Sequence, residues 1–163
     1  MREAVIELFK EEMKFSAGHF TVFSDTVREN LHGHNYSVYV ALTTLVGDEG
    51  LAFDYRFYKD KLQALCNQLD ETVLLAGRCK YLSIAEKENY YHIKFSNEEI
   101  IFLKRDVTIV PVANITVEEL SNWFIEQMLV DKKELEQHKI QGITIKVFSG
   151  PGQSGRSCWG KVG

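Results

Sequence analysis

The sequence has few cysteines and prolines. Its 163 residues include three cysteines and two prolines, and the cysteines form no C-x-x-C pair. An odd, scattered set of thiols argues against a disulfide framework and against a cysteine-built zinc site. We therefore expect Cys66, Cys79 and Cys158 to be reduced residues that serve packing.

Long apolar runs and long basic runs are absent as well. No uninterrupted apolar stretch approaches the length that crosses a bilayer, and Glu3 and Glu7 lie where a signal peptide would have its apolar core. The net charge of −4 comes without a basic run, which argues against nucleic acid and anionic membranes as partners. The sequence thus predicts a cytoplasmic protein and leaves a small polar metabolite open as its ligand.

What is present is an ordinary globular composition, with 45% hydrophobic and 26% charged residues. A chain of this length can bury one sizeable core. No internal repeat or low-complexity segment interrupts it. We expect a single domain over residues 1–163.

The pattern H-x-H at residues 32–34 is the strongest sign of chemistry. Alternate side chains of a strand point to the same face, so His32 and His34 project together. His19 lies thirteen residues upstream, at the end of another strand-like run, and three neutral imidazoles with an open fourth position hold catalytic zinc. The alternative is a pair of half-exposed strand histidines without a metal. His92 and His138 are expected to be surface or packing residues.

Three segments predict strands. Residues 5–17 and 36–46 alternate in part between apolar and polar side chains, and residues 142–148 form the last predicted strand. Residues 21–30 lack a clean period and predict a loop that returns His19 towards the histidine pair. Residues 150–155 also predict a loop, because glycine and proline recur there.

Two helices are predicted. The first begins near Asp54, which is a candidate cap, and the second begins at Thr116, with Glu119 completing a capping box. Apolar residues then recur at spacings of three and four, which gives each helix one buried face. In the first helix this face comprises Tyr58, Leu62, Leu65, Cys66 and Leu69, and in the second Leu120, Trp123, Phe124 and Met128.

Residues 90–95 and 100–104 flank a short polar segment and predict a hairpin, which residues 107–112 could extend. Residues 74–89 carry no clear pattern. The order of these elements is that of an α+β fold, with helices packed on one face of an antiparallel sheet.

Two motifs contain the three histidines, F-S-A-G-H at residues 15–19 and L-H-G-H-N-Y at residues 31–36. They resemble the zinc site of the 6-pyruvoyltetrahydropterin synthases and the related 6-carboxytetrahydropterin synthases. A-F-D-Y at 52–55 with Lys59, L-D at 69–70 and N-I-T-V-E at 114–118 follow in the family's order. The resemblance spans most of the chain outside the hairpin near 90–103, which we interpret as an insertion.

The resemblance implies a tunnelling fold, in which a four-stranded antiparallel sheet carries two helices on one face. It also implies that trimers close a β-barrel, that two trimers commonly stack as a hexamer, and that active sites lie between subunits. Zn²⁺ would be bound by His19, His32 and His34, and the substrate would be 7,8-dihydroneopterin triphosphate or a close relative.

The base of the reaction departs from the usual pattern. Most family members have a cysteine about four residues before the first motif histidine, where this chain has Arg28, and an arginine stays charged and cannot abstract a proton. Glu29 instead begins the pattern E-x-x-H-G-H, which resembles the subgroup of the family in which a glutamate replaces the cysteine. That subgroup is linked to formation of 6-hydroxymethyl-7,8-dihydropterin, a folate precursor. We predict Glu29 as general base, provided that burial raises its pKa towards neutrality. The alternative is an exposed loop acid.

Two further positions depart from the family. The histidine that usually follows Asp70 as a proton relay is Glu71 here, although Asp70 remains a candidate catalytic residue. The family also anchors the pterin with a glutamate after the last strand, whereas this chain has no acidic residue beyond Glu136. Thr116 and Glu118 are candidate substrate contacts, with helix capping as their alternative role.

Two functions therefore stay open. The first is a zinc-dependent lyase that acts on the side chain of a reduced pterin. The second is a catalytically divergent homologue that keeps the fold and the metal but binds a different small ligand. Neither the product nor the choice between trimer and hexamer follows from the sequence.

Overall fold

The computed structural model describes residues 1–162. It contains the helices α1 (Arg56–Leu69), α2 (Val117–Met128) and α3 (Lys132–Gln137), and a 3₁₀ turn η1 at Lys104–Asp106. Its strands are β1 (Arg2–Leu8), β2 (Lys14–His19), β3 (His32–Val46), β4 (Thr72–Ala76), β5 (Ser83–Lys87), β6 (Tyr90–Phe95), β7 (Glu98–Leu103), β8 (Val107–Val110), β9 (Ile140–Gly150) and β10 (Gln153–Gly160).

The main sheet is built around β3. Its strand order is β10-β9-β3-β2-β4-β8, and β1 also pairs with β3. One edge of β3 pairs with β9, while the other edge is long enough to take β2 and then β1 in succession. The single strand predicted over residues 5–17 is therefore wrong. The chain turns between β1 and β2, where the Met13 amide donates to the carbonyl of Lys10.

The sheet is larger than the four-stranded antiparallel sheet that the resemblance implied. It has seven strands, and β4 pairs in parallel with both β2 and β8. Strand β4 comes from residues 72–76, most of which carried no clear pattern, and β8 comes from residues 107–110, which were expected to extend the hairpin. The α+β class is confirmed, but the sheet is mixed.

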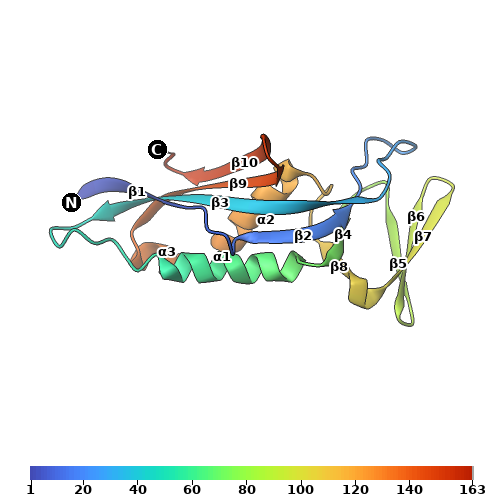
Figure 1. Ribbon diagram of the computed structural model, residues 1–163, viewed down its shortest axis with the longest axis horizontal. Helices are drawn as coiled ribbons and strands as arrows, with labels where there is room; N and C mark the ends of the chain where they lie inside the picture. Colours follow the sequence, from blue (N-terminus) through green and yellow to red (C-terminus); the bar gives the residue numbers. More distant parts are fainter. Residues whose placement is uncertain (163) are drawn as a thin grey trace.

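Helices α1 and α2 run along one face of this sheet (Figure 1). The residues predicted to form the apolar faces of both helices are buried. They pack with the inward side chains of the long central strand, which are Tyr36, Val38, Val40 and Leu42. The predicted helices are thus confirmed, and α3 adds a third short helix beside β9.

The cap of α2 follows the sequence in part. Thr116 caps α2, because its hydroxyl accepts a hydrogen bond from the Glu119 amide at 3.3 Å. The Glu119 carboxylate accepts from the Ala113 amide at 2.9 Å rather than from the Thr116 amide, so the predicted capping box is wrong in its second half.

The cap residue of α1 is Tyr55 rather than Asp54. The Asp54 carboxylate nevertheless accepts a hydrogen bond from the Arg56 amide at 3.0 Å, so it satisfies one of the free donors at that helix end.

Strands β5, β6 and β7 form a separate three-stranded sheet at the end of the molecule where β2 ends and β3 begins (Figure 1). The hairpin expected near residues 90–103 corresponds to β6 and β7. At the C-terminal side, the loop predicted over residues 150–155 is wrong. The chain turns at Pro151 and Gly152, where Gly152 has φ +85°, and β10 then pairs with β9 as an edge strand.

Within residues 1–162, no helix has the length and apolar character needed to span a membrane.

Replacement of Leu62 tests the packing of α1. Its side chain is fully buried against the sheet, so Leu62→Ala should lower the free energy of unfolding by about 2–5 kcal/mol, measured by urea denaturation. Gln68→Ala, on the exposed side of the same helix, is the control and should change it by less than about 0.5 kcal/mol. Equal effects of the two changes would contradict the assigned buried face.

Candidate active site

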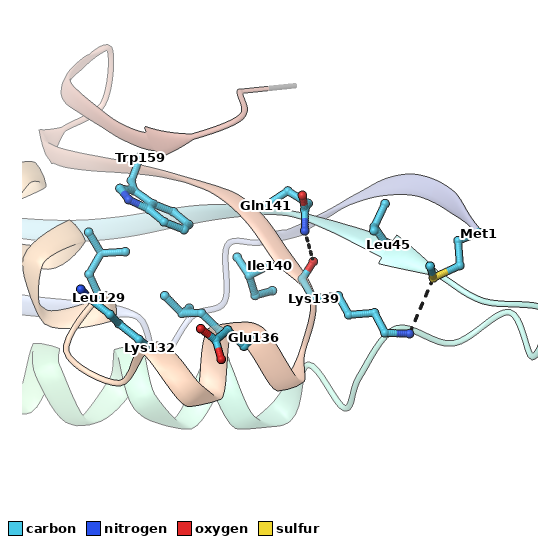
Figure 2. Close-up of a pocket in the computed structure, with 10 residues that line it drawn as sticks. Met1, Leu45, Leu129, Lys132, Glu136, Lys139, Ile140, Gln141 and Trp159 are labelled. Carbon is cyan, nitrogen blue, oxygen red and sulfur yellow. Dashed lines mark hydrogen bonds between the residues drawn. The ribbon is translucent and has the colours of Figure 1, made fainter.

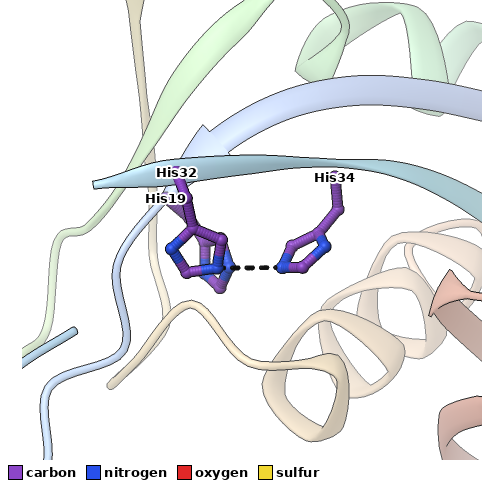
Figure 3. A group of neighbouring side chains, drawn as sticks. All are labelled: His19, His32 and His34. Carbon is purple, nitrogen blue, oxygen red and sulfur yellow. Dashed lines mark hydrogen bonds between the residues drawn. The ribbon is translucent and has the colours of Figure 1, made fainter. Parts of the chain in front are cut away.

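The paired strands β2 and β3 bring three histidines together. His19 lies directly opposite His32 in the β2–β3 pairing. His34 lies two residues further along β3, opposite Ala17, and therefore on the same face of the sheet. The ring centroid of His19 is 4.6 Å from that of His32 and 5.0 Å from that of His34. The three rings point into one space below the sheet (Figure 3). The sequence thus predicted a real cluster.

Backbone carbonyls fix the orientation of two of the rings. His19 Nδ1 lies 2.9 Å from the Ile115 carbonyl oxygen, and His32 Nδ1 lies 2.7 Å from that of Asn30. Since a carbonyl can only accept, each Nδ1 carries the proton and each Nε2 keeps a free lone pair. This arrangement of carbonyl, imidazole and free nitrogen is typical of metal-ligating histidines.

The free nitrogens have the spacing of a metal site. The three ligand atoms all lie within 4.8 Å of one another, and His32 Nε2 is 3.0 Å from His34 Nε2. Tetrahedral zinc with Zn–N bonds of 2.0–2.1 Å separates its nitrogens by roughly 3.3 Å. His19 Nε2 is buried and has no hydrogen-bond partner among the described residues. A buried polar atom without a partner is costly, so this nitrogen fits a cation.

The protonation of His19 also suits a ligand. Burial lowers the pKa of His19, and the neighbouring imidazoles lower it further, against the opposing effects of the Ile115 carbonyl and Glu29. Its ring is therefore neutral at physiological pH, which is the form that coordinates metals.

Glu29 lies beside the cluster. Its carboxylate accepts a hydrogen bond from the Thr21 amide at 3.0 Å and lies 3.9 Å from His32 Nε2. The Glu29 amide in turn donates to the Thr21 carbonyl at 2.8 Å, so the two residues bind each other across the loop. Thr21, which the sequence did not single out, holds the carboxylate towards the histidines.

The expectation that burial raises the pKa of Glu29 towards neutrality is wrong. Partial burial does act to raise this pKa, but hydrogen bonds from Thr21 and the imidazoles of His19 and His32 outweigh it and lower the pKa. Burial is the largest single contribution to this pKa, but the side chain is still 36% exposed, and the contributions that lower the pKa together exceed it. Glu29 is ionised at neutral pH and can accept a proton.

A cavity of about 250 Å³ joins these groups to the start of α2. Glu29, His34, Thr116 and Glu118 all line it. Helix α2 and strand β10 approach closely here, since a Cβ at Gly155 would lie 2.4 Å from the carbonyl of Val117.

Ser149 and Gln153 of the β9–β10 hairpin also line the cavity. The sequence missed Gln153 because the tail was predicted as a loop.

Asp70 is not among the residues that line this cavity. Its carboxylate accepts a hydrogen bond from the Ser16 amide at 2.8 Å and lines a different hollow, with Asn67 and Glu71. The structure thus brings Glu29, Thr116 and Glu118 together with the histidines but holds Asp70 apart within one chain.

A larger hollow, of about 690 Å³, lies elsewhere (Figure 2). Leu45, Leu129 and Trp159 give it an apolar lining, and Lys132 and Glu136 supply charges of opposite sign. It has no histidine and a single acid, so we place the chemistry at the smaller cavity beside the histidine cluster.

Comparison with known proteins gives one consistent result. A family model described as 6-pyruvoyl tetrahydropterin synthase matches residues 8–156. A protein named "Putative 6-carboxy-5,6,7,8-tetrahydropterin synthase" from Methanocaldococcus jannaschii is 26% identical over 150 residues, which are 91% of this chain and 90% of that protein. A protein of the same name from Pyrococcus horikoshii is 26% identical over 140 residues, 85% of this chain and 81% of that protein.

Solved structures agree. The 6-pyruvoyl tetrahydropterin synthase of Plasmodium vivax has a TM-score of 0.92 and 26% identity, covering 99% of this chain and 100% of that one. The Plasmodium falciparum enzyme has a TM-score of 0.91 and 27% identity, covering 98% and 99%. Two structures of the P. vivax protein carry alanine or cysteine in place of a glutamate that is described as a catalytic residue.

Replacement of one histidine tests the cluster as a metal site. His19→Ala removes the buried imidazole of the cluster, so a protein incubated with zinc and freed of unbound ion should retain much less zinc than the unaltered protein, as measured by elemental analysis. His92→Ala is the matched control, because His92 lies outside the cluster and pairs with Glu99 at 2.8 Å. A His19→Ala protein that keeps full zinc content would contradict the assignment.

Proposed function

Because the chain belongs to the 6-pyruvoyl tetrahydropterin synthase family, we propose that it is a zinc-dependent lyase that acts on the side chain of dihydroneopterin triphosphate or a close relative. The product would be 6-hydroxymethyl-7,8-dihydropterin or a 6-substituted tetrahydropterin. One observation carries the proposal: an ionised carboxylate, that of Glu29, lies 3.9 Å from a cluster of three imidazoles. The glutamate described as catalytic in the P. vivax relative supports this assignment.

In this proposal His19, His32 and His34 hold the zinc ion. When bound, zinc acts as a Lewis acid that polarises the oxygens of the substrate side chain and lowers the pKa of its hydroxyl groups. The chain contributes the imidazoles of His19 and His32, which are already oriented by the carbonyls of Ile115 and Asn30. Little reorganisation is then needed when the ion enters.

Glu29 acts as the general base. Its carboxylate is ionised, faces the histidine cluster and is held by the Thr21 amide, so it is oriented before the substrate arrives. A proton removed from a carbon or hydroxyl of the pterin side chain would be held on this carboxylate and returned to the product.

The lining residues at the start of α2 and in the β9–β10 hairpin bind the pterin. Glu118 is the acid among them, and a carboxylate can accept two hydrogen bonds from adjacent N–H groups of a pterin ring. The Thr116 hydroxyl and the polar groups of Ser149 and Gln153 would complete the contacts. Ser149 lies in the stretch where the family resemblance implies an anchoring glutamate, so more of the recognition falls on Glu118.

We also propose that residues 1–163 act as one domain that assembles into a homotrimer or hexamer. Strands β1 and β10 each have a single partner in the main sheet, β3 and β9 respectively. Their outer edges leave backbone donors and acceptors for strands of neighbouring subunits.

A second function is favoured by the serine at residue 149. The stretch in which the family resemblance implies an anchoring carboxylate offers a neutral hydroxyl to the cavity, and Glu71 replaces the relay histidine. A homologue that keeps the metal and binds a different small ligand would show neither turnover nor binding of dihydroneopterin triphosphate. Release of 6-hydroxymethyl-7,8-dihydropterin or another 6-substituted product by the zinc-loaded protein separates the two functions.

Replacement of Glu29 tests the proposed base. Glu29→Gln keeps the shape and an acceptor for the Thr21 amide but cannot take a proton, so kcat on dihydroneopterin triphosphate should fall about 10²- to 10⁴-fold with zinc content unchanged. Asp25→Asn, an exposed acid on the same loop, is the control and should leave kcat unchanged. Normal turnover in Glu29→Gln would remove Glu29 from the mechanism.

Asp70 is the second proposed catalytic group and has its own test. An asparagine oxygen can accept the same bond from the Ser16 amide, so Asp70→Asn should keep the thermal midpoint while it lowers kcat. Asp70→Ala loses that bond and should lower both. An unchanged kcat in Asp70→Asn would leave Asp70 with a purely structural role.

A further inference from the structure

Arg28 occupies the position at which the family resemblance implies a cysteine, yet its side chain takes no part in the cavity beside the histidines. The Arg28 side chain is only 15% exposed. Its guanidinium carbon lies 5.1 Å from the ring centroid of Phe20 and 5.8 Å from that of Phe95. Both phenylalanines are buried, so the cation lies against two buried aromatic rings.

These aromatic residues come from different parts of the chain. Phe20 directly follows the metal-site residue His19, whereas Phe95 ends β6 in the three-stranded sheet. The Arg28 side chain therefore lies at the junction between the active-site loop, residues 20–31, and that sheet.

The hydrogen bonds of Arg28 join the same two parts. Its Nη1 donates to the backbone carbonyl of Glu29 at 2.8 Å. Its Nε and Nη2 donate to the two carboxylate oxygens of Glu98, the first residue of β7, at 3.3 and 3.4 Å. A planar guanidinium can make all three bonds at once, which a lysine ammonium cannot do in this geometry.

We propose that Arg28 is a positioning residue for Glu29, and that the sheet β5–β7 serves as its support through Glu98 and Phe95. Glu29 is then held on both sides: its amide and carboxylate bind Thr21, and its carbonyl binds Arg28. The proposal rests on the catalytic role of Glu29 given above. It explains why an arginine, which cannot act as a base, stands next to the proposed base.

The alternative role for an arginine near a triphosphate substrate is anion binding. Three of the five N–H donors of Arg28 are already engaged by Glu29 and Glu98, and its charge is paired with the carboxylate of Glu98. A substrate phosphate would have to compete with these contacts. The contacts therefore favour positioning over substrate binding.

Two variants test this proposal. Arg28→Lys keeps the positive charge but loses the planar fork and the stacking, and Glu98→Gln keeps the hydrogen-bond acceptor but loses the charge. We expect kcat to fall at least tenfold in Arg28→Lys and about threefold in Glu98→Gln, with KM for dihydroneopterin triphosphate within twofold and zinc content unchanged. Glu86→Gln is the control, since Glu86 lies in β5 of the same sheet and pairs with Lys104 at 2.9 Å rather than with the active-site loop.

Hydrogen exchange supplies a readout that does not depend on turnover. In both variants the Thr21 and Glu29 amides should exchange at least threefold faster, while the amides of β6 should keep their rates. In the Glu86→Gln control, the Thr21 and Glu29 amides should exchange at the rates of the unaltered protein. Unchanged exchange in Arg28→Lys would overturn the proposal, as would a raised KM with unchanged kcat, which would indicate substrate binding. If the unaltered protein lacks turnover, the proposed function fails, and the exchange rates alone decide whether Arg28 positions Glu29.

Discussion

The register between β2 and β3 is the constraint on which the site depends. It places His19 opposite His32 and leaves His34 on the same face, whereas a slip by one residue would turn part of the cluster to the other side of the sheet. The same ladder carries Phe15 and Tyr36 into the core, where their rings stack at 4.8 Å. The packing that stabilises the fold therefore also fixes the spacing of the histidines.

Segments distant in sequence then complete the site. The Asn114 side chain accepts a hydrogen bond from the Val22 amide and donates to the Val22 carbonyl, and the next residue, Ile115, holds the His19 ring. The segment before α2 thus fixes a proposed metal ligand and the loop that carries Glu29. These contacts join residues more than ninety positions apart, so the arrangement exists only in the folded chain.

Local patterns in the sequence predicted part of this arrangement. The H-x-H alternation, the Thr116 cap and the apolar face of α1 each depend on neighbouring residues, and the structure contains all three. The parallel pairing of β4 and the pKa of Glu29 depend on partners that no local pattern identifies. In particular, burial was expected to control Glu29, but the Thr21 amide, which the sequence did not single out, contributes to the opposite shift.

The chemistry of a carboxylate also bears on the missing relay histidine. A cysteine thiol has an unperturbed pKa of about 8.5 and needs a neighbouring group to become ionised at neutral pH, whereas a glutamate, at about 4.3, is already ionised. In the proposed mechanism Glu29 therefore needs orientation more than activation. Thr21 and Arg28 are placed to orient it, since one binds its carboxylate and the other its carbonyl. A glutamate at residue 71 in place of the relay is compatible with such a base, because the base depends on a fixed position rather than on proton relay.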